Sequence, residues 1–263
     1  MSSDVERHVC GRIAATPVVD APFPHQVVTG VFPPEYYREL LDTLPSDATY
    51  RSIGETGTLS RADVYRERYV CDLVDLAAEE MDGERTFWRD LAAWLMNDRF
   101  RDFLVGCYTR QTTQRIGEGS AMRATVDARF VRDRTNFAIG PHTDAPRKLL
   151  SLLFYLPRTA AQAHLGTSIF APLDPAFRCA GGPHYSFDRF RRTETAPYVP
   201  NTLFVFFRTD QSFHGVEPIR DQEVERNLLL YNIYVAGVVK QKAPGFRLPW
   251  QSALPRNARV RSG

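Results

Sequence analysis

The 263-residue sequence predicts a mainly β protein, an antiparallel sandwich or barrel supported by N-terminal helices. Two observations predict this class. Residues 1–120 carry helical periodicity between loops, whereas residues 121–240 contain short β-type runs separated by turn residues. No helical pattern lies between those runs, so the crossover helices that parallel strands need are missing. We therefore expect a single domain over 1–263, with helical support in 1–120, a β core in 121–240 and a tail in 241–263.

Three amphipathic patterns account for the helical part. The first spans 34–44, where Pro34 suits the first helical turn and Pro45 stops the run. A second helix is expected after Asp72 and a third after Thr86, because both side chains can cap a helix N-terminus. Each pattern has one apolar face, which indicates that the helices pack on another layer.

The β part is expected to contain seven strands. The intervening segment 157–200 is rich in glycine, proline and arginine, and we expect much of it to cross the mouth of the barrel as a long excursion. The basic tail after residue 240 is predicted to wrap the surface or to be partly disordered. The predicted strands are 124–131, 136–140, 148–156, 167–171, 202–207, 213–219 and 226–239.

Composition excludes several classes of protein. The net charge is +2, from 33 basic and 31 acidic residues that are interspersed, so no nucleic-acid partner is expected. All but three of the basic residues are arginines, which codon bias explains better than polyanion binding.

The sequence shows neither a signal peptide nor an apolar run of roughly 18 residues, and we expect no membrane partner. Four widely spaced cysteines argue against a zinc knuckle or a disulfide framework and favour a reducing, cytoplasmic location. The four are Cys10, Cys71, Cys107 and Cys179.

The chemistry-bearing residues begin with His142 and Asp144. The sequence contains no GxSxG, HExxH, GxxxxGK[ST] or GxGxxG motif. It therefore lacks the motifs that are typical of common hydrolases, zincins, P-loop proteins and dinucleotide-binding proteins. In extended backbone, residues i and i+2 point to the same face, so these two side chains can reach one ion. Taken alone, the pair is a poor signal and a solvated turn is its default explanation, so a second element is needed.

His214 and Arg226 supply that element. His214 follows the apolar run 202–207, and a core histidine bonded to backbone is its plain interpretation. Arg226 opens an apolar strand, where a guanidinium requires a carboxylate partner. No acid in that strand can supply one, whereas a small dicarboxylate cosubstrate could. Two histidines and a carboxylate around an open-sided ion form the facial triad of non-haem iron oxygenases.

This order of motifs resembles the iron(II)/2-oxoglutarate-dependent oxygenases of the prolyl-hydroxylase-like branch. The similarity extends over about residues 22–239 and includes the lead-in FPHQVVTGVFPPEYYRELLDTLP. It implies a double-stranded β-helix, the cupin-like jelly roll. It also implies that His142, Asp144 and His214 bind Fe(II), that Arg226 binds the distal carboxylate of 2-oxoglutarate, and that Tyr155 adds a hydrogen bond there.

The sequence departs from the family pattern at three positions that affect the contacts of the cosubstrate. Arg226 lies further from His214 than is usual, Arg132 replaces a frequent tyrosine, and Leu228 stands where many relatives have serine.

The resemblance implies a dioxygenase that uses O2 and 2-oxoglutarate to hydroxylate an unactivated C–H of a small molecule, releasing succinate and CO2. Because Asp144 retains the carboxylate, hydroxylation is favoured over halogenation, while desaturation, epimerisation and ring closure stay open. A role in specialised metabolism and an anionic substrate fit this prediction, although Arg189, Arg191 and Arg192 are better explained as a solvated loop. Two alternatives stay open, a non-catalytic cupin-like protein that binds a metal or a small acid, and a protein side-chain hydroxylase. The oligomeric state is not predicted.

The remaining histidines of the second half and of the proline-rich entry segment are expected at the surface. His25, His164 and His184 lie in proline- or glycine-flanked segments, and none has a partner at ligand spacing.

Overall fold

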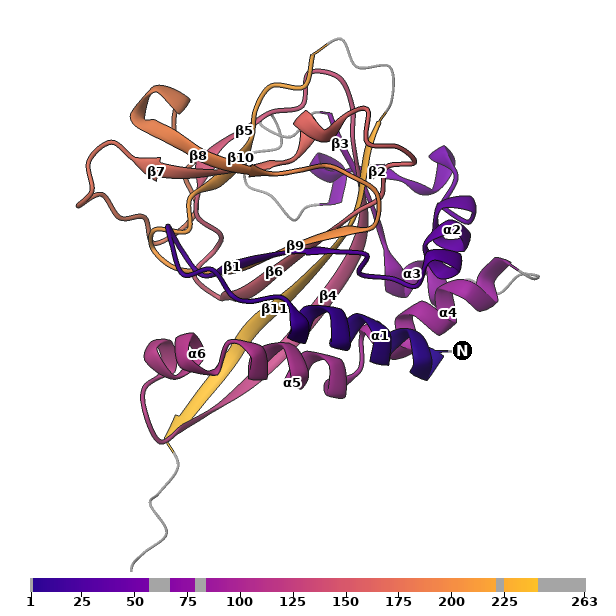
Figure 1. Cartoon of the computed structure of the whole chain (residues 1–263), viewed down its shortest axis with the longest axis horizontal. Coiled ribbons are helices and arrows are strands. Elements are labelled where there is room, and N and C mark those ends of the chain that lie inside the picture. Colours follow the sequence, from indigo (N-terminus) through magenta and orange to yellow (C-terminus); the bar gives the residue numbers. More distant parts are fainter. Residues whose placement is uncertain (1, 57–66, 79–83, 221–224, 241–263) are drawn as a thin grey trace, which may run out of the picture.

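Two antiparallel sheets lie face to face in the computed structural model, which describes residues 2–56, 67–78, 84–220 and 225–240 (Figure 1). The larger sheet has the strand order β1-β9-β6-β11-β4-β3-β2, and the smaller has the order β5-β10-β7-β8. The strands are β1 His25–Thr29, β2 Arg51–Ser52, β3 Arg68–Asp72, β4 Ser120–Asp133, β5 Ile139–His142, β6 Lys148–Tyr155, β7 Thr167–Pro172, β8 Phe190–Ala196, β9 Thr202–Phe207, β10 His214–Val216 and β11 Arg226–Lys240.

The eight strands from β4 to β11 form a double-stranded β-helix. Four of them pair as β4-β11-β6-β9 and the other four as β5-β10-β7-β8, so the chain passes repeatedly from one sheet to the other. All seven strands predicted from the sequence are present, with ends shifted by a few residues. The predicted jelly roll is therefore confirmed.

Three further strands extend the larger sheet and come from the part of the chain predicted to be helical support. β1 pairs with β9 at one edge, and β3 pairs with β4 at the other, where β2 follows. These strands have two to five residues, too few for a clear alternating pattern. Their places depend on long-range pairing with the core strands.

Helices cover the outer face of the larger sheet, on the side away from the smaller sheet (Figure 1). Alternation along β11 sends Leu229, Tyr231 and Ile233 into this helix-covered core, whereas Leu228 lies in the second core between the sheets. The helices are α1 Ser2–Ala15, α2 Pro34–Asp42, α3 Leu73–Ala78, α4 Glu84–Leu95, α5 Asp98–Cys107 and α6 Thr109–Ile116.

The predicted helices agree with three of these six. α2 begins at Pro34 as expected, and α3 begins directly after Asp72. α4 begins at Glu84, so Thr86 lies inside this helix and is not its cap. α5 was not predicted, although Asn97 caps it by accepting a hydrogen bond from the backbone N–H of Phe100. Among the described residues, no helix is both long and apolar enough to span a bilayer.

The segment 157–200 differs from the predicted excursion. It contains β7 and β8, which pair as antiparallel neighbours at the edge of the smaller sheet. β8 was missed because its sequence FRRTETA is mostly polar, as suits an exposed edge strand. Arg191 and Arg192 therefore lie on a strand and not in a loop. The predicted C-terminal tail lies outside the described residues.

Candidate metal centre and cavity

The strand pairing brings His142 and His214 together across 71 intervening residues. They are direct cross-strand partners on β5 and β10, and their ring centroids lie 4.3 Å apart. Asp144 follows β5 by two residues, and one ligand atom from each of the three side chains lies within 4.8 Å of the others. The three residues predicted from the sequence as metal ligands are thus gathered at one buried point.

Both imidazole rings are held by backbone carbonyls. Nδ1 of His142 donates to the carbonyl of Gly140 at 3.0 Å, and Nδ1 of His214 donates to that of Ser212 at 2.9 Å. A carbonyl only accepts, so each Nδ1 carries the proton and each Nε2 of the neutral ring keeps a lone pair. This outer hydrogen bond is the one that metal-binding histidines typically make. The donor set therefore fits a divalent transition-metal ion.

Electrostatics keeps the three groups in their metal-binding protonation states. Burial lowers the pKa of His142 well below its ordinary value, with further lowering from His214 and His184, and burial likewise lowers the pKa of His214. Burial by itself would raise the pKa of Asp144, but the positive charge of Lys148 and the hydrogen bond from Ser151 oppose it, and that pKa lies well below its usual range. The site thus offers two neutral nitrogens and one carboxylate.

Two residues that sequence reasoning missed orient Asp144. Ser151 donates to its Oδ2 at 2.6 Å, and the Lys148 ammonium lies 3.1 Å from its Oδ1. Both belong to β6, next to Asp144 in sequence and in space. Lys148 is one of only three lysines in the chain, which was the available signal.

Close backbone packing around the site requires two glycines. A Cβ on Gly140 would overlap the carbonyl oxygen of Tyr185, and a Cβ on Gly215 would lie 2.5 Å from the carbonyl oxygen of Ile139. These glycines allow β5, β10 and the loop before β8 to approach closely. The same loop places His184 beside His142, with ring centroids 4.5 Å apart.

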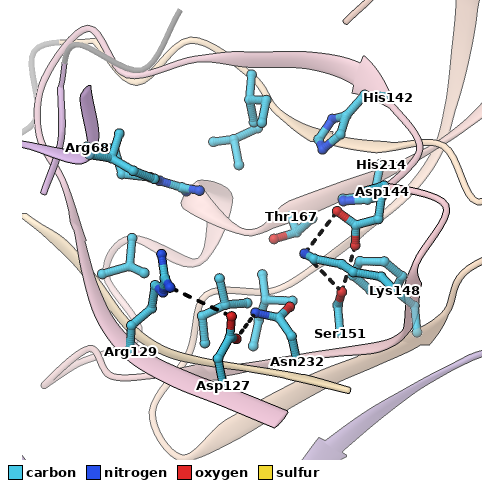
Figure 2. A pocket seen from close by; sticks show the side chains of 18 of the residues that line it. Arg68, Asp127, Arg129, His142, Asp144, Lys148, Ser151, Thr167, His214 and Asn232 are labelled. Atoms are coloured by element: carbon cyan, nitrogen blue, oxygen red, sulfur yellow. Dashed lines mark hydrogen bonds and ion pairs between the residues drawn. The ribbon is translucent and has the colours of Figure 1, made fainter. Parts of the chain in front are cut away.

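A cavity of about 280 Å³ opens beside the three residues, between the two sheets (Figure 2). Its lining includes five cationic side chains and two carboxylates, together with apolar residues of both sheets. The charged groups are Arg68, Arg129, Arg147, Lys148, Arg226, Asp127 and Asp144.

The inward face of the larger sheet changes character along the strands. One end is ionic, the middle is apolar and the other end is polar. Cross-strand rows of partners from these three regions are Arg68/Asp133/Arg226, Val131/Leu228/Tyr155 and Asp127/Asn232/Ser151.

Arg226 is fully buried at the ionic end, as the apolar strand predicts, but its carboxylate partner is a residue of the protein. Its Nη1 lies 2.6 Å from Oδ2 of Asp133, on the neighbouring strand β4. Its Nε donates to the carbonyl of Leu165, and its Nη2 donates to Oγ1 of Thr167. Arg226 therefore does not depend on a cosubstrate for a carboxylate partner, because Asp133 on the neighbouring strand supplies one.

Asp133 is shared with a second arginine, Arg68, which lines the cavity. The Arg68 guanidinium donates to both carboxylate oxygens, at 2.7 and 2.9 Å. Tyr155 lies beside the same cluster, 5.6 Å from its ring centroid to the Arg226 guanidinium carbon, and its hydroxyl accepts from the backbone N–H of Thr167. Tyr155 thus lies next to Arg226, and its hydrogen bond to the cosubstrate stays a prediction.

The surface prediction for the other histidines holds for His164 alone. His164 is exposed and His184 is half-buried against His142. His25 is buried, with Nδ1 donating to the carbonyl of Phe23 and Nε2 lying 2.7 Å from Glu194. The flanking prolines misled the prediction, since β1 starts at this histidine.

The sequence matches no protein-family model, and a search of curated proteins finds no significant match. Similar solved structures include a Pseudomonas putida prolyl-4-hydroxylase, 16% identical over 90% of this chain and 100% of that one, with a TM-score of 0.48. An oxidoreductase of the 2OG-Fe(II) oxygenase family from Burkholderia pseudomallei is 14% identical over 90% and 94%, with a TM-score of 0.45. The non-heme alpha-ketoglutarate-dependent epimerase SnoN from nogalamycin biosynthesis is 13% identical over 100% and 95%, with a TM-score of 0.47. An activity for this chain must be argued from its own residues.

Proposed function

We propose that the chain is an Fe(II)- and 2-oxoglutarate-dependent dioxygenase that hydroxylates a C–H bond of a small molecule and releases succinate and CO2. The observation that carries this proposal is the buried set of two neutral imidazole Nε2 atoms and one carboxylate at the wall of a cavity. Two histidines and a carboxylate leave part of the coordination sphere of a transition metal open, which is the arrangement of non-haem Fe(II) oxygenases. When bound, Fe(II) with 2-oxoglutarate and O2 supplies the oxidising chemistry.

In this proposal His142, Asp144 and His214 hold the metal, and Arg226 binds the distal carboxylate of the cosubstrate. The spacing supports that pairing of roles. Thr167, which Arg226 contacts, lies two residues along β7 from Ile169, the cross-strand partner of His214. Two residues of a strand span about 7 Å, a distance that a five-carbon dicarboxylate can bridge.

The cosubstrate end carries a positive charge even though Asp133 is present. Arg68 and Arg226 share the single carboxylate of Asp133, and both line the cavity. Asp133 fixes the orientation of the two guanidinium groups, and Tyr155 packs beside them. A second carboxylate is attracted to such a cluster because it meets planar donors that are already positioned.

The lining also bears on the substrate. Five cations line the cavity, against the carboxylates of Asp127, Asp144 and the Asp133 that Arg68 and Arg226 share. Positive charge is in excess, so a small organic anion is the preferred substrate class in this proposal. A cavity of about 280 Å³ between two sheets suits a small molecule better than a peptide segment. Hydroxylation is the reaction we assign, within a role in specialised metabolism.

The test separates metal binding from cosubstrate binding. Anaerobic addition of Fe(II) and 2-oxoglutarate should produce the weak visible charge-transfer band of a metal-chelated keto acid. His214→Ala should lose the metal and the band. Arg226→Lys keeps one positive charge for Asp133 but loses the planar fork, so it should retain Fe(II) and bind 2-oxoglutarate more weakly. Arg158→Lys, at an exposed ion pair with Asp42, is the matched control and should behave like the wild type.

Turnover distinguishes the proposal from the two alternatives. A dioxygenase releases succinate when a suitable small molecule is added under air. A folded, Fe(II)-loaded protein that shows no band with 2-oxoglutarate would contradict the proposal and favour a non-catalytic metal-binding protein. Succinate release stimulated by peptides alone would favour a side-chain hydroxylase.

A further inference from the structure

The side-chain oxygen Oδ1 of Asn232 is a buried polar atom that has no role in the proposed metal or cosubstrate binding. Asn232 lies on the inward face of β11 between Ser151 of β6 and Asp127 of β4, and only 2% of its surface is exposed. Its side chain lines the cavity, yet its Oδ1 has no hydrogen-bond partner among the described residues. A buried acceptor without a donor is costly, so such an atom calls for an explanation.

Asp127 determines which way the amide faces. The amide nitrogen Nδ2 donates to Oδ1 of Asp127 at 2.6 Å, and the hydroxyl of Tyr234 donates to the other oxygen of Asp127 at 2.8 Å. An ionised carboxylate accepts hydrogen bonds and donates none, so the nitrogen must point to Asp127 and the oxygen must point away from it. Figure 2 shows the amide beside Asp127, with its oxygen on the side of the cavity.

The neighbour on the other side cannot supply the missing donor. The hydroxyl of Ser151 donates its only proton to Oδ2 of Asp144. The Lys148 ammonium is directed at Asp144 and Ser151. The oxygen of Asn232 is therefore left for a group that enters the cavity. It lies one strand away from the serine that touches a predicted metal ligand.

We infer that Asn232 is a specificity-determining residue, whose Oδ1 accepts a hydrogen bond from a hydroxyl or amide N–H of the substrate. Asp127 acts as the positioning residue that keeps the oxygen turned to the cavity. That the bound molecule is a substrate rests on the proposed function. That Asn232 binds a hydrogen-bond donor rests on the geometry alone. Sites built around a buried polar group reject analogues that lack the matching group, because the buried atom then stays unpaired.

Three benzoates that differ at one position probe the inference with the metal-free full chain. 4-Hydroxybenzoate offers a donor, 4-methylbenzoate is nearly the same size and offers none, and 4-methoxybenzoate offers only an acceptor. The shared carboxylate meets the cationic lining. Titration calorimetry should show 4-hydroxybenzoate binding about three- to tenfold more tightly than the other two, as expected for one hydrogen bond to a neutral acceptor.

Two variants and a control assign the preference to Asn232. Asn232→Leu should bind the three benzoates equally. Asp127→Asn removes the constraint on the amide without changing its size, so the amide can rotate and the preference for the hydroxyl should fall. Leu230→Met changes an adjacent inward side chain at nearly constant volume, and it should leave the ratio unchanged. Thermal unfolding checks that each variant is folded, and Asp127→Asn carries the test if Asn232→Leu is not.

Three results would overturn the inference: equal binding of the benzoates to the wild type, a preference that survives in Asn232→Leu, or no binding of any benzoate at millimolar concentration. The Fe(II)–2-oxoglutarate band, recorded on the wild type and on Asn232→Leu, tests the proposed function separately. A missing band with an intact hydroxyl preference would reject the dioxygenase and keep the acceptor. An intact band without the preference would do the reverse.

Discussion

Removing Asp133 should destabilise the protein far more than removing any exposed carboxylate. Its side chain has no exposed surface, and it contacts Arg226, which is also fully buried, and Arg68. Deleting one partner of a buried ion pair leaves the other charge uncompensated, which costs about 3–5 kcal/mol. For a chain of this size, that loss lowers the melting temperature by roughly 6–20 °C. We expect Asp133→Ala to lower the melting temperature by an amount in this range. Asp133→Asn keeps the volume and one acceptor, so it should lower the melting temperature by less.

Urea unfolding followed by tryptophan fluorescence measures the effect, with Asp42→Ala as the matched control. Asp42 makes an ion pair of 3.0 Å with Arg158, but both side chains are more than half exposed, so its loss should cost less than about 1 kcal/mol. The reasoning is refuted if Asp133→Ala is no more destabilising than Asp42→Ala. Such a result would mean that the buried arginines do not depend on this carboxylate.

Three further predictions concern the metal centre. Burial holds the pKa of both histidines below the ordinary value, so the unfolded chain takes up protons that the folded chain does not. The melting temperature of the metal-free protein should therefore fall as the pH drops from about 7 to 5, Zn(II) should oppose the fall, and a flat profile would contradict this. Ser151→Ala removes the hydrogen bond to Asp144 and should weaken metal binding about tenfold in a chelator competition. Gly140→Ala places a Cβ against the carbonyl of Tyr185 and should also weaken metal binding, whereas Gly11→Ala, which meets nothing within 4 Å, should bind metal normally.

The strands of the core could be predicted because each one carries its own signal. TLFVFF and KLLSLLFY are apolar, bounded by turn residues and buried as β9 and β6. β8 could not be recognised in the same way, because an edge strand exposes polar side chains and its place depends on pairing with β7. The short strands β1 and β3 fail for a related reason, since five residues give little periodicity and the core sheet determines where they pair.

The candidate site likewise contains residues that a local sequence pattern predicts and residues whose role depends on strand pairing. His142, Asp144 and His214 could be proposed because two of them share a strand-like spacing and the third follows a strong apolar strand. The partner of Arg226 could not be proposed, because it does not lie in the same strand. Asp133 is the cross-strand partner of Arg226 across the β4–β11 ladder, 93 residues away in the sequence. Pairing across a ladder depends on register, and register is a property of the assembled sheet.

Register also explains how one strand can serve both ends of the cavity. Arg226 and Asn232 are six residues apart on β11, an even number, so both side chains point between the sheets. β11 is paired with β4 through this whole stretch and with β6 from Leu228 onward, and its irregularities, after Ile233 and after Val235, lie beyond Asn232. The separation between the two groups is therefore fixed by strand geometry at about 20 Å along the backbone. A one-residue slip would put Tyr231 or Ile233 in the place of Asn232 and would turn the buried Arg226 guanidinium toward the helix-covered core. The energetic cost of that change favours a single register of the sheet and a single arrangement of charge in the cavity.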